Sequence, residues 1–208
     1  MRGFCHNENM KNWWHSQKNI AISLMIVSIV GLVASLTLGY ETLQSFKDPS
    51  YVPSCNLNPI VSCGTAMESK WSEIFGIPNP LFGIMGFTAL LTMSVALLLG
   101  GPARKRLWAL IGLGALGGII FMKYLFLISM VFTNSVCPWC FVIWMTSIAL
   151  FWFVVTYMAA NKMFNFNKQL TRLSRWWVKY SAPILISWYL IILIIIFLRF
   201  KEFWLSLI

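Results

Sequence analysis

Two cysteines three positions apart are the residues of this chain best able to do chemistry. Cys137 and Cys140 form a Cys-Pro-Trp-Cys motif that opens a long apolar run, residues 141–160. On a helix, residues three apart share a face, so the two thiols can join in a disulfide. Cys137 would feel the free amides and the positive end of the helix dipole. The motif therefore predicts thiol–disulfide exchange, with Cys137 the more easily ionised thiol and the better nucleophile.

The second thiol of the motif lies one turn deeper in the apolar run. Cys140 is predicted to be within reach of a molecule dissolved in lipid, which suggests a relay from aqueous thiols to a lipid-soluble electron acceptor. The alternatives are a structural CxxC or half of a zinc site. Zinc needs further Cys or His ligands, and the two histidines, His6 and His15, are both near the N-terminus. We therefore expect no metal.

The composition is that of a membrane protein. Of 208 residues, 59% are hydrophobic and only 11% charged, too little polar surface to cover a soluble globule. The first apolar run is too long for a cleaved signal peptide alone. We predict an all-α integral membrane protein, a four-helix transmembrane bundle plus a fifth transmembrane helix. The predicted spans are approximately residues 19–40, 80–100, 107–132, 137–160 and 181–200.

The net charge of +10 is distributed unevenly along the chain. Five spans place three basic segments on one side: the N-terminal segment 1–18, the second loop and the loop 161–180. This positive-inside pattern predicts a cytoplasmic N-terminus and attraction to anionic membrane lipid. Nucleic acid is not needed as a partner to explain the charge. The fifth helix and a short exoplasmic tail would occupy residues 181–208.

With this orientation, the loop 41–79 and the link 133–136 face the exoplasmic side, where disulfides persist. Cys55 and Cys63 lie in that loop, eight positions apart. They can close a small disulfide loop or remain free to exchange. As a static crosslink the pair would contribute about 2–4 kcal/mol. Cys5 is expected to be a reduced cytoplasmic thiol.

Three other stretches carry structural expectations. Apolar residues at helical spacing predict a short amphipathic helix over residues 65–75, serving as a lid over the bundle or as a membrane anchor. Lys123, inside a span, is either a functional charge or a snorkelling side chain. The basic loop after the fourth span is predicted to be amphipathic and interfacial. The third span contains four glycines that permit close helix packing, Gly112, Gly114, Gly117 and Gly118.

Taken together, three motifs resemble the vitamin K epoxide reductase family in its bacterial form. They are the loop pair Cys55 and Cys63, the string Phe-Gly-Ile-Pro-Asn-Pro-Leu-Phe-Gly at residues 75–83, and the CxxC motif. The resemblance covers residues 19–160. It implies a four-helix bundle around a quinone, either a menaquinone or a ubiquinone. It also implies that Cys140 faces the quinone, Cys137 exchanges disulfides with Cys63, and Cys55 meets the thiol of a partner.

The resemblance extends to three residues expected to bind or support the quinone. Asn79 matches a family asparagine that hydrogen-bonds a quinone carbonyl, a task that suits its amide; it could also cap the second span. Ser69 matches a loop serine near the cysteines and is expected to support the structure. Trp144 stands where vertebrate members have a tyrosine, and its indole can donate a hydrogen bond.

The resemblance implies a quinone-dependent thiol–disulfide oxidoreductase that spans the cell inner (cytoplasmic) membrane several times, with its active site on the exoplasmic side. Many bacterial relatives carry a fused thioredoxin-like domain after a fifth span, and none follows Ile208 here. The expected partner is therefore a separate exported thioredoxin-like protein of the DsbA type. A DsbB-type oxidase is disfavoured because its two cysteine pairs occur in the opposite order. A non-catalytic scaffold with two structural disulfides and a transporter are the alternatives from other classes.

Overall fold

Five long helices dominate the computed structural model, which describes residues 14–48, 50–58, 60–101, 104–163 and 168–201. All five are long and apolar enough to cross a membrane, so the prediction of an all-α membrane protein is confirmed. They are α2 (Gln17–Lys47), α4 (Asn79–Leu98), α5 (Lys105–Ile128), α6 (Pro138–Ala160) and α8 (Ser181–Arg199). The shorter elements are α3 (Gly64–Met67), β1 (Glu73–Ile74), β2 (Ile77–Pro78), the π-helix η1 (Ser129–Thr133) and α7 (Lys168–Lys179).

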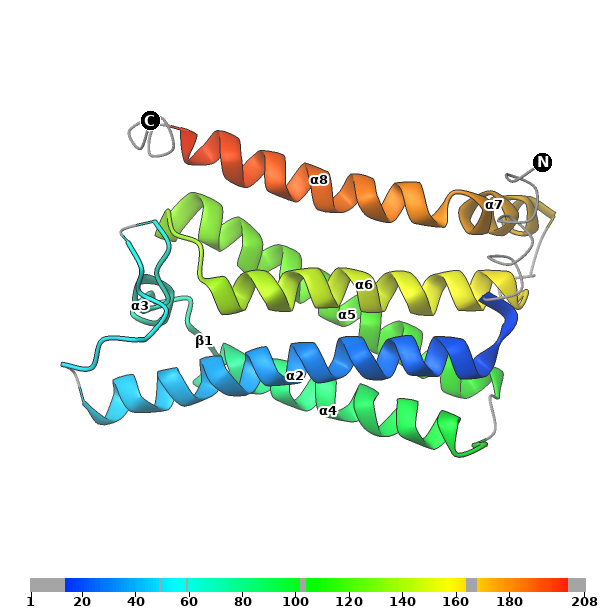
Figure 1. Ribbon diagram of the computed structural model, residues 1–208, viewed down its shortest axis with the longest axis horizontal. Helices are drawn as coiled ribbons and strands as arrows, with labels where there is room; N and C mark the ends of the chain where they lie inside the picture. The colour runs from blue at the N-terminus through cyan, green and yellow to red at the C-terminus, as the bar shows by residue number, and fades with distance from the viewer. Residues whose placement is uncertain (1–13, 49, 59, 102–103, 164–167, 202–208) are drawn as a thin grey trace.

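Helices α2, α4, α5 and α6 form the bundle, and α8 lies along its outside next to α6 (Figure 1). Helix α2 packs against both α4 and α6. The core includes Leu24 of α2, Phe87 of α4 and Val154 of α6, all at most 5% exposed. The C-terminal end of α2 and the first residues of α4 and α6 meet at one end of the bundle (Figure 1). We call it the cysteine end, because the loop with Cys55 and Cys63 and the CxxC motif at the start of α6 lie there.

The helices approach each other most closely at glycines outside the third span. A Cβ atom on Gly31 of α2 would overlap the ring of Phe87, and one on Gly83 of α4 would overlap Ser35 Oγ. In contrast, a Cβ on Gly114, Gly117 or Gly118 would meet no atom of the described chain within 4 Å, and only Gly112 of the four is near another helix, at Met158. The glycines of the third span thus permit close approach, but only at Gly112 does the described chain use it.

Two hydrogen bonds and a cation–π contact connect α8 to the bundle. The Tyr189 hydroxyl donates a hydrogen bond to the Met145 carbonyl at 3.0 Å, and Arg199 Nε donates to the Met130 carbonyl at 2.9 Å. Lys123 Nζ of α5 lies 4.8 Å from the ring centroid of Trp188. Such a cation–π contact is favourable in apolar surroundings. Lys123 therefore joins α5 to α8.

Helix α7 runs across the end of the bundle opposite the cysteines and is seen end-on in Figure 1. Trp177 stacks on Trp152 of α6, with ring centroids 4.2 Å apart, and its Nε1 donates to Thr156 Oγ1 at 3.1 Å. The helix is amphipathic, as predicted. Its basic residues share one face because their spacing follows the helical turn, and they are Lys168, Arg172, Arg175 and Lys179.

The first helix is longer than its apolar run. Helix α2 begins at Gln17 and continues to Lys47, so the loop starts at Asp48 rather than at Glu41. Glu41 is only 4% exposed, and it is tolerated there because its carboxylate accepts hydrogen bonds from Tyr51 and Ser54. Residues 1–13, including Cys5 and His6, lie outside the described residues, so the expectations about them stay untested.

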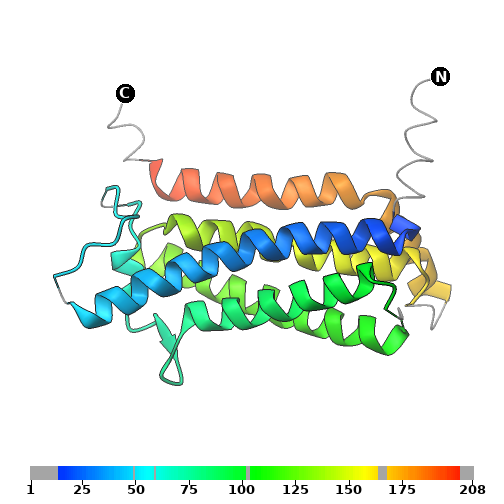
Figure 2. The ribbon, with the colours of Figure 1, turned by 60° about the horizontal axis from the view of Figure 1, so that its bottom comes forward.

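The predicted amphipathic helix over residues 65–75 was wrong. Helix α3 ends at Met67, and β1 pairs antiparallel with β2, Ile74 opposite Ile77. Phe75 (φ 53°) and Gly76 (φ 74°) form the turn between them, the left-handed pair that a tight hairpin requires. Figure 2 shows the hairpin projecting from the bundle, and Phe75 at its tip is 97% exposed. The Phe-Gly dipeptide is therefore a turn and not the end of a helix.

Candidate active site

The four cysteines of the loop and of the CxxC motif meet at the cysteine end. Cys55 and Cys63 are joined in a disulfide, with Cα atoms 5.6 Å apart. Cys137 and Cys140 are free thiols. Cys137 Sγ lies 3.1 Å from Cys63 Sγ, and Cys63 and Cys137 are 0% and 2% exposed. A thiol and a disulfide are thus held in contact, shielded from water.

Backbone hydrogen bonds set this contact. Val136, immediately before Cys137, donates its N–H to the Ile60 carbonyl at 2.7 Å and accepts from the Ser62 N–H at 3.3 Å. This two-bond ladder aligns the residue before Cys63 with the residue before Cys137. The distance between the two sulfurs therefore follows from main-chain pairing as well as from side-chain packing.

Asn56 holds the two ends of the disulfide loop together. Its Oδ1 accepts from Ser62 Oγ at 3.0 Å and from the Gly64 N–H at 2.8 Å, the residues on either side of Cys63. A Cβ on Gly64 would come within 2.8 Å of the Asn56 side chain. These contacts give the disulfide loop a defined conformation. Sequence reasoning missed Asn56, although asparagine beside a cysteine in a Pro-bounded loop is a frequent turn residue.

Cys137 occupies the N-cap of α6, as the helix start at Pro138 requires. Proline suits the first helical turn because its missing N–H has no intrahelical partner there. The Cys137 sulfur accepts from the Cys140 N–H at 3.4 Å. Hydrogen bonding to the Cys140 thiol, together with this backbone contact, lowers the pKa of Cys137, against the opposing effects of burial and of the Glu41 charge. The predicted ease of ionisation of Cys137 is therefore supported.

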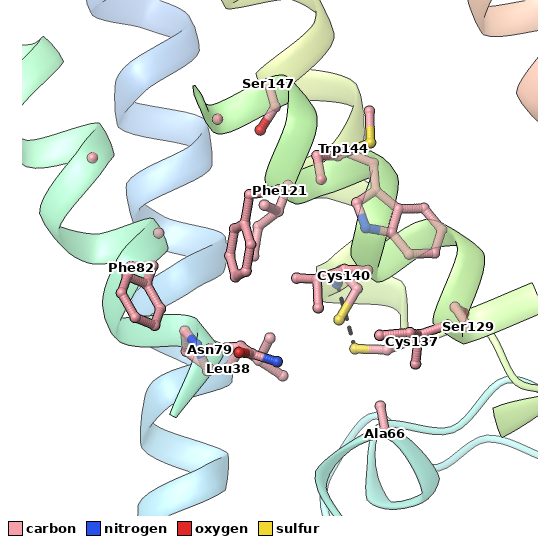
Figure 3. Close-up of a pocket in the computed structure, with 18 of the residues that line it drawn as sticks. Leu38, Ala66, Asn79, Phe82, Phe121, Ser129, Cys137, Cys140, Trp144 and Ser147 are labelled. Carbon is pink, nitrogen blue, oxygen red and sulfur yellow. Dashed lines mark hydrogen bonds between the residues drawn. The ribbon is translucent and has the colours of Figure 1, made fainter. Parts of the chain in front are cut away.

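An apolar cavity of about 190 Å³ opens between α2, α4, α5 and α6 beside the CxxC motif. Cys140 lies on its wall, with Trp144 one turn further along α6 (Figure 3). Phe82 and Phe121 pack edge to face, with ring centroids 5.6 Å apart, and also line the cavity. Trp144 is 2% exposed and packs edge to face on Phe126. The cavity has the apolar, aromatic walls that suit a flat hydrophobic ring.

Asn79 supplies the main polar group aimed into this cavity (Figure 3). Its backbone N–H donates to the Ser72 carbonyl at 3.0 Å, and its Nδ2 donates to the Trp71 carbonyl at 2.7 Å. Its Oδ1 is buried and has no hydrogen-bond partner among the described residues. A buried acceptor without a donor is costly, and a ligand hydroxyl would satisfy it. The second Nδ2 hydrogen is also free to reach a ligand carbonyl.

Ser69 also lines the cavity, but its hydroxyl donates to the Ala66 carbonyl at 2.9 Å. This bond is local to the loop, and the supporting role of Ser69 stays a prediction. Within the described part of the chain, no three His, Cys, Asp or Glu side chains lie close enough together to hold a metal ion. Of the seven predicted site residues, the structure brings six to the cavity or to its sulfurs directly, and Cys55 through its disulfide.

Sequence comparison agrees with these motifs. The model of the vitamin K epoxide reductase family matches residues 22–156 of the chain. The match spans the four-helix bundle, the loop disulfide and the CxxC motif.

Proposed function

The chain belongs to the vitamin K epoxide reductase family, and we propose that it generates disulfides by passing electrons from a partner dithiol to a membrane quinone. Family membership makes it a multi-pass membrane thiol–disulfide oxidoreductase. Members of the family use quinone-type electron carriers and work with thioredoxin-like partners. The contact of 3.1 Å between Cys63 Sγ and Cys137 Sγ carries the proposal, because it joins the loop pair to the CxxC pair.

In the proposed relay, a partner thiolate attacks Cys55 and displaces Cys63 as a thiolate. Cys63 then attacks Cys137 of an oxidised CxxC, and Cys140 leaves as a thiolate. The second thiol of the partner attacks the mixed disulfide, releases Cys55 and departs oxidised. Cys55 closes the cycle by attacking Cys63, which expels the Cys137 thiolate. The pairing seen here, with the loop pair oxidised and the CxxC reduced, is the state that this last exchange produces.

The reduced CxxC must then lose two electrons and two protons as the Cys137–Cys140 disulfide re-forms. A quinone supplies the acceptor chemistry, taking up both electrons and both protons to become a hydroquinone. The cavity fits this role because Cys140 is on its wall, and because Asn79 presents there a second Nδ2 hydrogen that suits a quinone carbonyl and an unsatisfied Oδ1 that suits a hydroquinone hydroxyl. Asn79 would orient the ring by donating from Nδ2 to one quinone oxygen. Trp144 and Phe121 would form apolar walls, and Ser69 would support the adjoining loop.

The charge distribution supports a proposed orientation. All four acidic residues that the structure describes, Glu41, Asp48, Glu68 and Glu73, belong to the cysteine end. Basic residues gather at the opposite end, in α7 and at the start of α5. By the positive-inside rule, the cysteine end would be exoplasmic, in the inner membrane, with residues 1–18 and 161–180 cytoplasmic. The partner would then be a separate exported thioredoxin-like protein of the DsbA type.

Quinone reduction by the purified protein tests the proposal. The protein would be mixed anaerobically with a reduced exported thioredoxin-like protein and with a menaquinone or ubiquinone analogue, and quinone absorbance followed. We expect reduction by the native chain and loss of it on Ser replacement of Cys55, Cys63, Cys137 or Cys140. The Ser50→Ala variant, altered in the same loop away from the sulfurs, is the matched control. Absence of reduction with any quinone, while all four cysteines stay locked in disulfides, would favour a scaffold instead.

A further inference from the structure

Glu41 is a buried carboxylate that the relay above does not use. It lies in the last turns of α2 and is 4% exposed. Its Oε2 accepts from the Tyr51 hydroxyl at 2.7 Å and from the Ser54 N–H at 3.3 Å, and its Oε1 accepts from Ser54 Oγ. Hydrogen bonds to a charged acceptor are the stronger ones. One side chain of a rigid helix thus binds two residues of the loop.

The two loop residues that Glu41 binds stand just before Cys55. Ser54 is adjacent to it, and the hydrogen bond to Glu41 raises the pKa of Tyr51, so Tyr51 stays a neutral donor over the physiological range. On the other side of Cys55, Asn56 is tied to Ser62 and Gly64. Cys55 is therefore held from both sides, to α2 through Glu41 and to the Cys63 segment through Asn56.

We propose that Glu41 is a positioning residue that keeps Cys55 beside Cys63 while the bond between them is open. The inference rests on the proposed relay, in which Cys55 must return to Cys63 after its partner leaves. Without the bonds to Glu41, the freed Cys55 would be held only from the Asn56 side. With them, its thiol stays at the distance from which it can attack, which raises its effective concentration.

The step that Glu41 assists balances without any external reagent. The Cys55 thiolate attacks Cys63 Sγ of the Cys63–Cys137 disulfide. A Cys55–Cys63 bond forms, the Cys63–Cys137 bond breaks, and the electron pair leaves on Cys137 as its thiolate. One disulfide is exchanged for another, and no atom is oxidised or reduced overall. The equilibrium between the two pairings therefore reports directly on how well Cys55 is positioned.

This equilibrium can be measured in full-length protein that carries Cys140→Ser. That change leaves Cys55, Cys63 and Cys137 to share one disulfide. After thiol-buffer equilibration, acid quenching and alkylation, mass spectrometry of the peptides gives the ratio of Cys55–Cys63 to Cys63–Cys137. With Glu41 present we expect Cys55–Cys63 to dominate. Glu41→Gln keeps the shape but loses the charge and one acceptor oxygen, and should lower the ratio about tenfold.

Two comparisons separate positioning from general loss of structure. Glu68→Gln removes the same charge from an exposed site of the same loop and should leave the ratio unchanged. Tyr51→Phe deletes one of the three bonds and keeps the carboxylate, so it should lower the ratio less than Glu41→Gln does.

The Glu41 charge also raises the pKa of Cys137, so its loss alone favours departure of the Cys137 thiolate and would raise the ratio. The Ser54→Ala, Tyr51→Phe double variant keeps this charge, so an unchanged ratio in that folded variant, judged by circular dichroism, would overturn the proposal. So would an equal fall in the Glu68→Gln control.

The double variant also serves if Glu41→Gln does not fold. It removes two of the three donors to Glu41, the Ser54 and Tyr51 hydroxyls, and leaves the Ser54 N–H. The assay contains neither quinone nor partner protein. Failure of quinone reduction would therefore contradict the proposed function, whereas an unmoved pairing ratio would contradict only the role of Glu41.

Discussion

Cys63 and Cys137 are 74 positions apart in the chain, yet their sulfurs lie 3.1 Å from each other. The main-chain bonds of Val136 to Ile60 and Ser62 hold this register. Exchange of a disulfide between the loop and the CxxC motif thus needs little movement of the backbone. The loop pair and the CxxC pair are therefore in direct sulfur–sulfur contact through Cys63 and Cys137.

The first prediction is that this contact can be trapped. Removing Cys55 and Cys140 together by serine substitution leaves Cys63 and Cys137 as the facing pair. We expect them to form a disulfide under mild oxidation, found by mass spectrometry of peptides from non-reduced protein. Replacing Cys63 and Cys140 instead leaves Cys55 and Cys137, which should pair much more slowly. Equal rates in the two double variants would show that the Cys63–Cys137 contact does not govern exchange.

The second prediction concerns pH. Hydrogen bonding to Cys140 lowers the pKa of Cys137, and only the thiolate attacks. The thiolate is therefore present above this lowered pKa and is lost as the pH falls through it. Cys140→Ala removes the thiol hydrogen bond and should raise the pKa of Cys137, moving the titration to higher pH. Cys140→Ser keeps a donor and should move it less.

Ultraviolet absorbance of the thiolate measures that titration, in protein whose Cys55–Cys63 disulfide is intact. Each position-140 variant with Cys137→Ser added supplies the baseline, because it keeps the signals of Cys5 and of the tyrosines and loses only that of Cys137. Identical titrations of the Ala and Ser variants at position 140 would contradict the assigned cause.

A third prediction separates quinone binding from disulfide exchange. Asn79→Ala removes both the unsatisfied Oδ1 and the hydrogen bond from Nδ2 to the Trp71 carbonyl. The KM for quinone should rise about tenfold, and the free energy of unfolding should fall by about 1–3 kcal/mol because the Trp71 carbonyl loses its donor. The Cys63–Cys137 disulfide of the trapping variant should still form at its normal rate.

The matched control is Ser147→Ala, at another polar residue of the cavity wall. If the quinone KM of folded Asn79→Ala protein equals that of the native chain, Asn79 has no part in binding, and its contribution is confined to anchoring the hairpin.

Sequence reasoning succeeded where the signal is local. Runs of apolar residues gave the five long helices, and the CxxC motif gave a thiol at a helix start, because both depend on residues adjacent in the chain. Helix α2 exceeded its apolar run because Glu41 is stabilised by Tyr51 and Ser54, contacts across a loop that no pattern reveals. Glu41 itself, a lone acid at the end of an apolar run, indicates a buried polar site but not which loop residues bind it.

The stretch 65–75 failed for a different reason. Its apolar spacing matches a helix, but Trp71 packs on Tyr124 and Phe132, and Asn79 binds the Ser72 and Trp71 carbonyls. These tertiary contacts outweigh the local helical pattern. As a result, the chain reverses in a turn at Phe75–Gly76 instead of continuing as a helix. The placement of Asn79 toward the cavity depends on the same contacts, so only the family resemblance could suggest it from sequence.

The last prediction tests where the bundle is tightly packed. Gly31 is buried between α2 and α4, where a methyl group would overlap the Phe87 ring. Gly31→Ala should therefore lower the free energy of unfolding by about 1–3 kcal/mol, the usual cost of overpacking. Gly117 of α5 is exposed, with no described atom within 4 Å of its Cβ position, so Gly117→Ala should be neutral or stabilising. Thermal unfolding in detergent compares the two, and a greater loss for Gly117→Ala would place the close packing on α5, whose glycines permit it.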